Sequence, residues 1–208
     1  MWYPILIAAI TAYLLGNLNG AVCVSALIAH DDVRTHGSGN AGLTNFIRNY
    51  GAAHSLLVIA IDAGKAVVAC LMAGLLLEPY GYSLEGKVLG GLAVMLGHVF
   101  PALLGFKGGK GILSGCFIAI VVDWRIALLI LAVFAVIYLM TQYVSLASIL
   151  AAATFGIGFA VVYASNFSVA VGCLLMSALT IFMHRGNIAR LLKGQERKTN
   201  LFGKGKQK

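Results

Sequence analysis

The sequence predicts an all-α integral membrane protein of about seven transmembrane helices, and two observations support this. Hydrophobic residues make up 60% of the 208 residues and charged residues only 11%, a balance that no water-soluble domain of this length could cover with polar surface. The apolar residues fall into long runs separated by polar breaks. Because a span needs about 20 apolar residues, we expect roughly five to seven helices in a single membrane domain, with residues 1–184 as its core.

The runs define the spans in order. The fourth and fifth runs are short and share the break at Asp123, so they could also form a re-entrant pair, which leaves five full spans. The first run is too long for a signal-peptide core and is expected to remain as a helix. Cysteines 23, 70, 116 and 173 lie inside apolar runs without metal or redox spacing and are expected to be free and buried. The predicted spans are residues 4–29, 51–77, 87–104, 112–122, 126–141, 146–164 and 168–183.

Basic residues predict the orientation of the spans. Arg34, Arg48, Lys107, Lys110 and the tail, residues 185–208, together contain twelve lysines and arginines, and seven spans place all of them on one side. Cytoplasmic loops are the ones rich in Lys and Arg, so the N-terminus is predicted outside and the C-terminus in the cytoplasm. The net charge of +8 therefore indicates membrane topology and anionic headgroups, and no nucleic-acid partner. The last residues, 202–208, are predicted to be a disordered basic extension.

The first polar island, residues 34–48, is a glycine-rich loop that opens onto a helix. Its glycines match the spacing of a dinucleotide fingerprint, but that motif requires a preceding strand, and a membrane helix precedes this one. Backbone N–H groups beside hydroxyl, amide and guanidinium groups suit an anion; a flexible interhelical turn is the alternative. The candidate ligands are Gly37, Ser38, Gly39, Asn40, Gly42, Thr44, Asn45 and Arg48.

The second polar island, residues 97–111, interleaves glycines with two lysines. It is not a nucleotide-hydrolysing P-loop, because Gly111 and Ile112 stand where a Mg²⁺-binding Ser or Thr is required. Free backbone N–H groups with two ammonium groups suit a phosphate monoester, whereas positive-inside anchoring would explain the lysines alone. The candidate ligands are Lys107, Gly108, Gly109, Lys110 and Gly111, with His98 as either a ligand or an interfacial histidine.

The third polar island follows the last span. His184, Asn187 and Arg190 are spaced by three residues and share one side of a helix. Glu196 is the only acid within the three polar islands, where it is surrounded by cationic residues, so we expect it to be ionised and paired, a structural role. Ser145, in the short connection after the fifth run, adds a hydroxyl at the same face.

Polar residues inside the spans need partners because burial in lipid is costly. Asn17, Asn19 and Ser25 lie in the first run, and Asp62 and Lys65 lie three residues apart in the second. We expect these groups to tie helices together rather than to contact a ligand directly.

Together these residues resemble the bacterial acylphosphate-dependent glycerol-3-phosphate acyltransferases, the PlsY family. Gly-Ser-Gly-Asn-Ala-Gly-Leu-Thr-Asn is similar to the family's G-S-G-N-P-G-A-T-N, with Ala41 and Leu43 as departures that affect loop rigidity. Gly-His-Val-Phe-Pro with Phe-Lys-Gly-Gly-Lys-Gly matches the second family motif fully, and His-x-x-Asn-Ile with Gln-Glu resembles the third.

The resemblance implies transfer of a fatty acyl group from acyl phosphate to the sn-1 hydroxyl of glycerol 3-phosphate, which yields lysophosphatidic acid and inorganic phosphate. It also implies a multi-pass protein of the bacterial inner membrane with a cytoplasmic active site, no cofactor and no metal, and a functional link to a soluble enzyme that makes acyl phosphate from acyl carrier protein. The catalytic positions implied are Ser38, Arg48, Lys107, His184 and Asn187.

The proton acceptor stays open at this point. The phosphate of the donor is favoured, with His98 or His184 as competitors, and a covalent acyl–Ser38 intermediate is less favoured because acyl phosphate is already activated. A transporter of anionic phosphate esters is the alternative function, although its site would belong near the membrane midplane and no inverted repeat is evident.

Overall fold

The computed structural model describes residues 2–199, and every regular element in that range is a helix. Four short helices complete the loops: η1 (Val33–Thr35), η2 (Glu78–Tyr80), η3 (Ala102–Leu104) and α10 (Arg185–Leu192). The other helices are α1 (Trp2–Gly16), α2 (Gly20–Ala29), α3 (Leu43–Tyr50), α4 (Ser55–Leu77), α5 (Ser83–Val99), α6 (Ile112–Val122), α7 (Trp124–Thr141), α8 (Val144–Val162) and α9 (Phe167–Met183).

The predicted membrane helices are present, but fewer than the predicted seven are long enough to cross a bilayer alone. Five segments are long and apolar enough to cross a bilayer. The pair α9 and α10, which is bent by 54°, makes a sixth if it counts as one span. The remaining predicted span, α6, has 11 residues, about half of what a full crossing requires. Residues 112–122 therefore form a short apolar helix between longer ones, joined to α7 by a sharp turn at Asp123.

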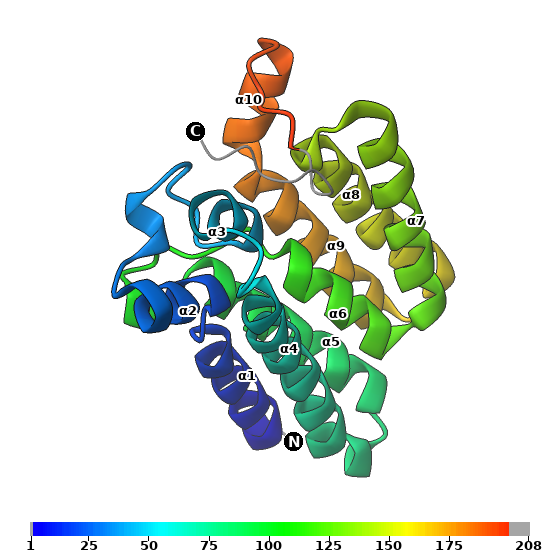
Figure 1. Ribbon diagram of the computed structural model, residues 1–208. Helices are drawn as coiled ribbons and strands as arrows, with labels where there is room; N and C mark the ends of the chain where they lie inside the picture. The colour runs from blue at the N-terminus through cyan, green and yellow to red at the C-terminus, as the bar shows by residue number, and fades with distance from the viewer. Residues whose placement is uncertain (1, 200–208) are drawn as a thin grey trace.

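Two groups of helices make up the molecule (Figure 1). α1, α4 and α5 pack against one another, and α8 packs against both α7 and α9, while α6 and the α5–α9 contact join the groups. Glycines allow the closest approach: a Cβ at Gly90 would lie 2.4 Å from the carbonyl oxygen of Ala69, and one at Gly97 would lie 2.1 Å from that of Tyr13. Small residues at crossings are how membrane helices gain contact where the hydrophobic effect is absent.

The first predicted span is not continuous, because the chain breaks between α1 and α2. Asn19 caps α2 by accepting a hydrogen bond from the backbone N–H of Val22 (3.1 Å), and its amide nitrogen donates to the Ala41 carbonyl (3.0 Å). The side chain of Asn17 accepts from the N–H of Leu103 at 3.0 Å. The intramembrane asparagines thus tie the break to the two glycine-rich loops.

Those loops gather at one end of the molecule. In Figure 1, α3 and α10 lie at the end opposite the N-terminus, consistent with polar islands that share one membrane face. The four cysteines are free, with Cys70 and Cys173 buried and Cys23 and Cys116 half-buried. The predicted basic extension, residues 202–208, lies outside the described residues.

Candidate active site

A cavity of about 1130 Å³ opens between the two helix groups and connects two different environments. One end is polar and contains residues from all three predicted islands. The other end is apolar and runs between α6, α7, α8 and α9. The polar lining includes Gly37, Ser38, Gly39, Asn40, Gly42, Thr44, Asn45, Arg48, His98, Lys110, Gly111, Ser145, His184, Asn187, Arg190 and Glu196.

The first loop is folded around the buried side chain of Asn45. Its amide nitrogen donates to the carbonyls of Val33 (2.9 Å) and His36 (3.1 Å), and its oxygen accepts from the N–H of Ser38 (3.0 Å). Gly37 has φ +59°, and a Cβ there would lie 2.5 Å from the Asn45 oxygen. Asn45, predicted as a ligand, therefore shapes the loop that presents Ser38 to the cavity.

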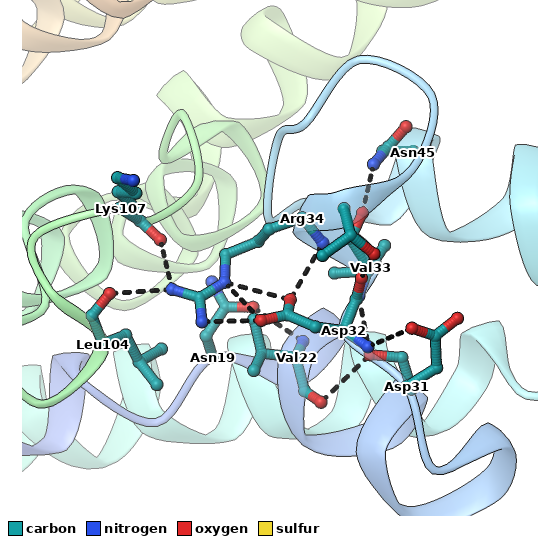
Figure 2. A network of polar contacts seen from close by, with 11 residues as sticks. Asn19, Val22, Asp31, Asp32, Val33, Arg34, Asn45, Leu104 and Lys107 are labelled. Atoms are coloured by element: carbon teal, nitrogen blue, oxygen red, sulfur yellow. Dashed lines mark hydrogen bonds and ion pairs between the residues drawn. The ribbon is translucent and has the colours of Figure 1, made fainter.

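Arg34 connects this loop to the second one, as Figure 2 shows. Its guanidinium binds the Asp32 carboxylate, with the shortest contact at 2.7 Å, and its Nη1 donates to the carbonyls of Leu104 (2.7 Å) and Lys107 (3.3 Å). The hydrogen bond from Arg34 lowers the pKa of Asp32, so the carboxylate stays charged at neutral pH. One side chain thus sets the distance between the two loops.

In the second loop the structure separates the two predicted lysines. Lys110 lines the cavity, while Lys107 is exposed and, with Gly108 and Gly109, is not among the lining residues. The glycines are needed because the loop runs directly over His98: a Cβ at Gly108 would lie 2.0 Å from the His98 carbonyl oxygen, and one at Gly109 would lie 2.2 Å from His98 Nε2.

Lys110 leads into a chain of polar contacts with the third island. Its ammonium donates to Asn187 Oδ1, and Asn187 Nδ2 donates to Glu196 Oε1 at 2.7 Å. Arg190 binds the other carboxylate oxygen at 2.7 Å. Burial lowers the pKa of Lys110 to about 8. Burial alone would raise the pKa of Glu196, but the hydrogen bonds from Asn187 and Arg190 outweigh it and leave that pKa lowered.

Arg48, an exposed residue that lines the cavity, supplies a second cation at the polar end. Burial lowers its pKa, yet a guanidinium keeps its proton at any physiological pH. It donates to Thr199 Oγ1, and the Thr199 N–H donates to the Gln142 carbonyl at 3.0 Å. The segment after α10 therefore passes beside Arg48 and closes part of the cavity wall.

His184 sits where α9 bends into α10. Its Nδ1 lies 2.8 Å from the Thr180 carbonyl oxygen, which can only accept, so Nδ1 carries the proton and a neutral His184 has its lone pair on Nε2. His184 therefore offers the cavity a hydrogen-bond acceptor.

Several lining residues lie outside the set of ligands predicted from the sequence. The apolar wall comes from residues that are ordinary span residues in the sequence, and only packing shows that they face a cavity. Asp62 also lines it, and the presence of a charged residue inside a span was the available signal. The added residues include Leu113, Cys116, Phe134, Ala152, Phe155, Met176, Arg185 and Arg197. Residues 2–199 contain no cluster of three or more His, Cys, Asp or Glu arranged to hold a metal ion.

Comparison with known proteins agrees with this geometry. The family model for glycerol-3-phosphate acyltransferase matches residues 6–194. The glycerol-3-phosphate acyltransferase of Clostridioides difficile strain 630 is 38% identical over 200 residues, covering 94% of this chain and 96% of the relative, and that of Thermoanaerobacter sp. strain X514 is 37% identical, covering 92% and 94%.

Two solved structures have the same fold. The crystal structure of PlsY (YgiH), an integral membrane glycerol 3-phosphate acyltransferase, in its glycerol 3-phosphate form matches with a TM-score of 0.85 and 35% identity, covering 96% of this chain and 99% of that one. Its lysophosphatidic acid form matches with a TM-score of 0.81 and 34% identity, covering 94% and 95%. The chain therefore belongs to the glycerol-3-phosphate acyltransferase family of integral membrane proteins.

Proposed function

We propose that this protein transfers a fatty acyl group from acyl phosphate to the sn-1 hydroxyl of glycerol 3-phosphate, giving lysophosphatidic acid and inorganic phosphate. One observation carries the proposal: a single cavity joins a cationic, glycine-rich end to an apolar passage between α6 and α9. The cationic end suits the phosphates of both substrates, and the passage suits a fatty acyl chain. The relative crystallised with glycerol 3-phosphate and with lysophosphatidic acid supports the acceptor and the product.

In the proposed reaction the sn-1 oxygen attacks the acyl carbon and the bond from that carbon to the phosphate oxygen breaks. The hydroxyl proton passes to the departing phosphate, so inorganic phosphate leaves with the proton and no added base is consumed. Arg48 and Lys110 offset the phosphate charge, and the N–H groups of the glycine-rich loops stabilise the leaving group. His184 Nε2 is the competing acceptor, because its lone pair is free in the neutral tautomer.

Ser38, Lys107 and Asn187 are proposed to position the substrates. Ser38 is exposed on the loop that lines the cavity, and Asn187 orients Lys110. Lys107, exposed on the same loop as Lys110, is proposed to guide glycerol 3-phosphate into the cationic end. We place this site on the cytoplasmic face of the bacterial inner membrane, where a soluble enzyme that makes acyl phosphate from acyl carrier protein would supply the donor.

Parallel assays with different donors test this proposal. Purified protein receives radiolabelled glycerol 3-phosphate with palmitoyl phosphate, palmitoyl-CoA or an acyl carrier protein thioester, and both lysophosphatidic acid and inorganic phosphate are followed. We expect product with acyl phosphate only, without added metal, and a collapse of activity in Ser38→Ala and Lys107→Ala. Lys193→Ala, an exposed lysine outside the cavity, is the matched control. Folded protein that makes no product with any donor would contradict the proposal and direct attention to phosphate-ester flux in liposomes.

Replacing Arg34 by lysine is expected to lower kcat/KM for glycerol 3-phosphate about tenfold, because one ammonium cannot hold the Asp32 carboxylate and two loop carbonyls at once. Steady-state assays of Arg34→Lys, Asp32→Asn and the double variant measure this, and the two changes should be clearly non-additive. Arg125→Lys is the control, since Arg125 pairs with Asp123 in the same way far from the cavity. Equal activity of Arg34→Lys and the unaltered protein would show that this link does not position the loops.

A further inference from the structure

A buried ion pair in α4 lies against the break in the first span. Asp62 and Lys65 are 2.8 Å apart, and each side chain is only 2% exposed. Lys65 donates to the carbonyl of Gly16, at the end of α1, and to that of Leu18, in the break, while Asp62 accepts from the Gly20 N–H (3.1 Å) at the start of α2. These are the groups that a broken helix leaves without partners, so the pair ties helices together, as its place in the sequence predicts.

The same lysine also contacts His98 of α5. Lys65 Nζ lies 2.8 Å from His98 Nδ1. An ammonium group has donors only, so Nδ1 must accept, and the ring proton of His98 is then on Nε2. Asp62 Oδ1 is 3.6 Å from Nδ1, which is too long for a hydrogen bond. Among the described residues, the charged groups that act on His98 are Lys65 and Asp62, both from α4.

The Nε2 side of His98 faces the cavity. His98 is 4% exposed, is one of the lining residues, and has Nε2 against the Gly109 backbone. No partner for Nε2 occurs among residues 2–199, and the atom is not sealed off from the cavity. A buried donor without a partner is costly unless a ligand completes it. The N–H of His98 is therefore available to an anionic oxygen inside the cavity.

We propose that Lys65 and Asp62 hold His98 as the Nε2–H tautomer, so that His98 donates a fixed hydrogen bond to an anionic substrate oxygen and does not act as the base. This rests on the function proposed above. Lys65 and Asp62 are positioning residues in this arrangement, and His98 is the group that contacts the substrate. The two cavity histidines then have opposite roles, because His184 carries its proton on Nδ1 and offers an acceptor.

Nitrogen-15 NMR of histidine-labelled protein tests the tautomer without any assay of activity. The chemical shifts of protonated and unprotonated imidazole nitrogens differ, so each ring reports which nitrogen carries the proton. We expect Nε2–H for His98 and Nδ1–H for His184 at neutral pH, with His98→Gln and His184→Gln assigning the signals. Adding glycerol 3-phosphate should shift the His98 Nε2 signal. An imidazolium or an Nδ1–H form of His98 would overturn the proposal, and this readout stays valid even if no acyl transfer occurs.

Kinetics of two His98 variants test the role of the donor. Glutamine keeps an N–H donor near the position of Nε2 but cannot act as a base, whereas leucine removes both functions. Since loss of one donor to a developing charge costs about a hundredfold or more, we expect His98→Leu to lose that much in kcat while His98→Gln retains at least a tenth of the activity. Equal loss in both variants would favour a base and contradict the proposal. His54→Gln, outside the cavity, is the control.

A substitution at Lys65 tests the positioning role. In Lys65→Met the nearest charged partner of His98 Nδ1 is Asp62, which favours a proton on Nδ1. We expect kcat/KM to acquire a dependence on pH in the histidine range beyond the one that ionisation of glycerol 3-phosphate gives the unaltered protein, and Lys65→Arg to remove that added dependence by restoring a donor. Asp62→Asn with Lys65→Met provides a charge-neutral version if the single variant does not fold. Unchanged pH profiles in folded Lys65→Met would refute the positioning role.

Discussion

Replacing Arg48 by alanine is expected to lower kcat/KM for glycerol 3-phosphate by roughly a thousandfold. Arg48 is an exposed residue that lines the polar end of the cavity, and its guanidinium can bind two phosphate oxygens at once. Removal of such a group from a developing charge costs up to about 4 kcal/mol, which corresponds to roughly a thousandfold in rate. Steady-state kinetics with acyl phosphate as donor measure the effect.

Two further variants make this result specific to Arg48. Arg48→Lys should restore only part of the lost activity, since an ammonium is a point charge and cannot form the paired contact. Arg125→Ala removes an exposed arginine in the first turn of α7, outside the cavity, and should leave kcat/KM unchanged. A loss in Arg48→Ala smaller than about tenfold would mean that Arg48 only closes the cavity through its contact with Thr199.

The second large effect concerns Lys110 and pH. Burial lowers the pKa of Lys110 to about 8, so its ammonium is protonated below that pH and loses its charge above it. The phosphate of glycerol 3-phosphate is already a dianion above about pH 6 to 7, so only the enzyme loses charge. We therefore expect kcat/KM for glycerol 3-phosphate to be level from pH 7 to 8, as an approximate window, and to fall about tenfold per pH unit above it.

Substitutions of Lys110 separate this group from others that titrate nearby. Lys110→Arg keeps a cation through the whole range and should remove the fall above pH 8, whereas Lys110→Ala should lose about a hundredfold below pH 8 and less above it, where Lys110 of the unaltered protein is neutral as well. Lys193→Arg is the matched control, because Lys193 is exposed and does not line the cavity. If the fall persists in Lys110→Arg, another group controls the affinity for glycerol 3-phosphate.

Much of the fold follows from local patterns that the sequence contains. The run at residues 112–122 became α6 with the same limits, and the neighbouring run became α7, because apolar residues between polar breaks are sufficient to form a helix. The break between α1 and α2 was not predicted. It depends on Lys65 and Asp62 from a different helix, so no local pattern contains it, and the asparagines beside it were the only signal.

The sequence by itself determined the membrane class, the helical fold, the polar islands and the resemblance to the acyltransferase family, because these depend on composition, hydrophobic runs and motif spacing. Only the tertiary structure decided which residues line the cavity. It separated Lys110 from Lys107, used Asn45 to fold a loop, and gave His98 and His184 opposite tautomers. The physical reason is that burial and the direction of a hydrogen bond depend on atoms brought together from distant parts of the chain.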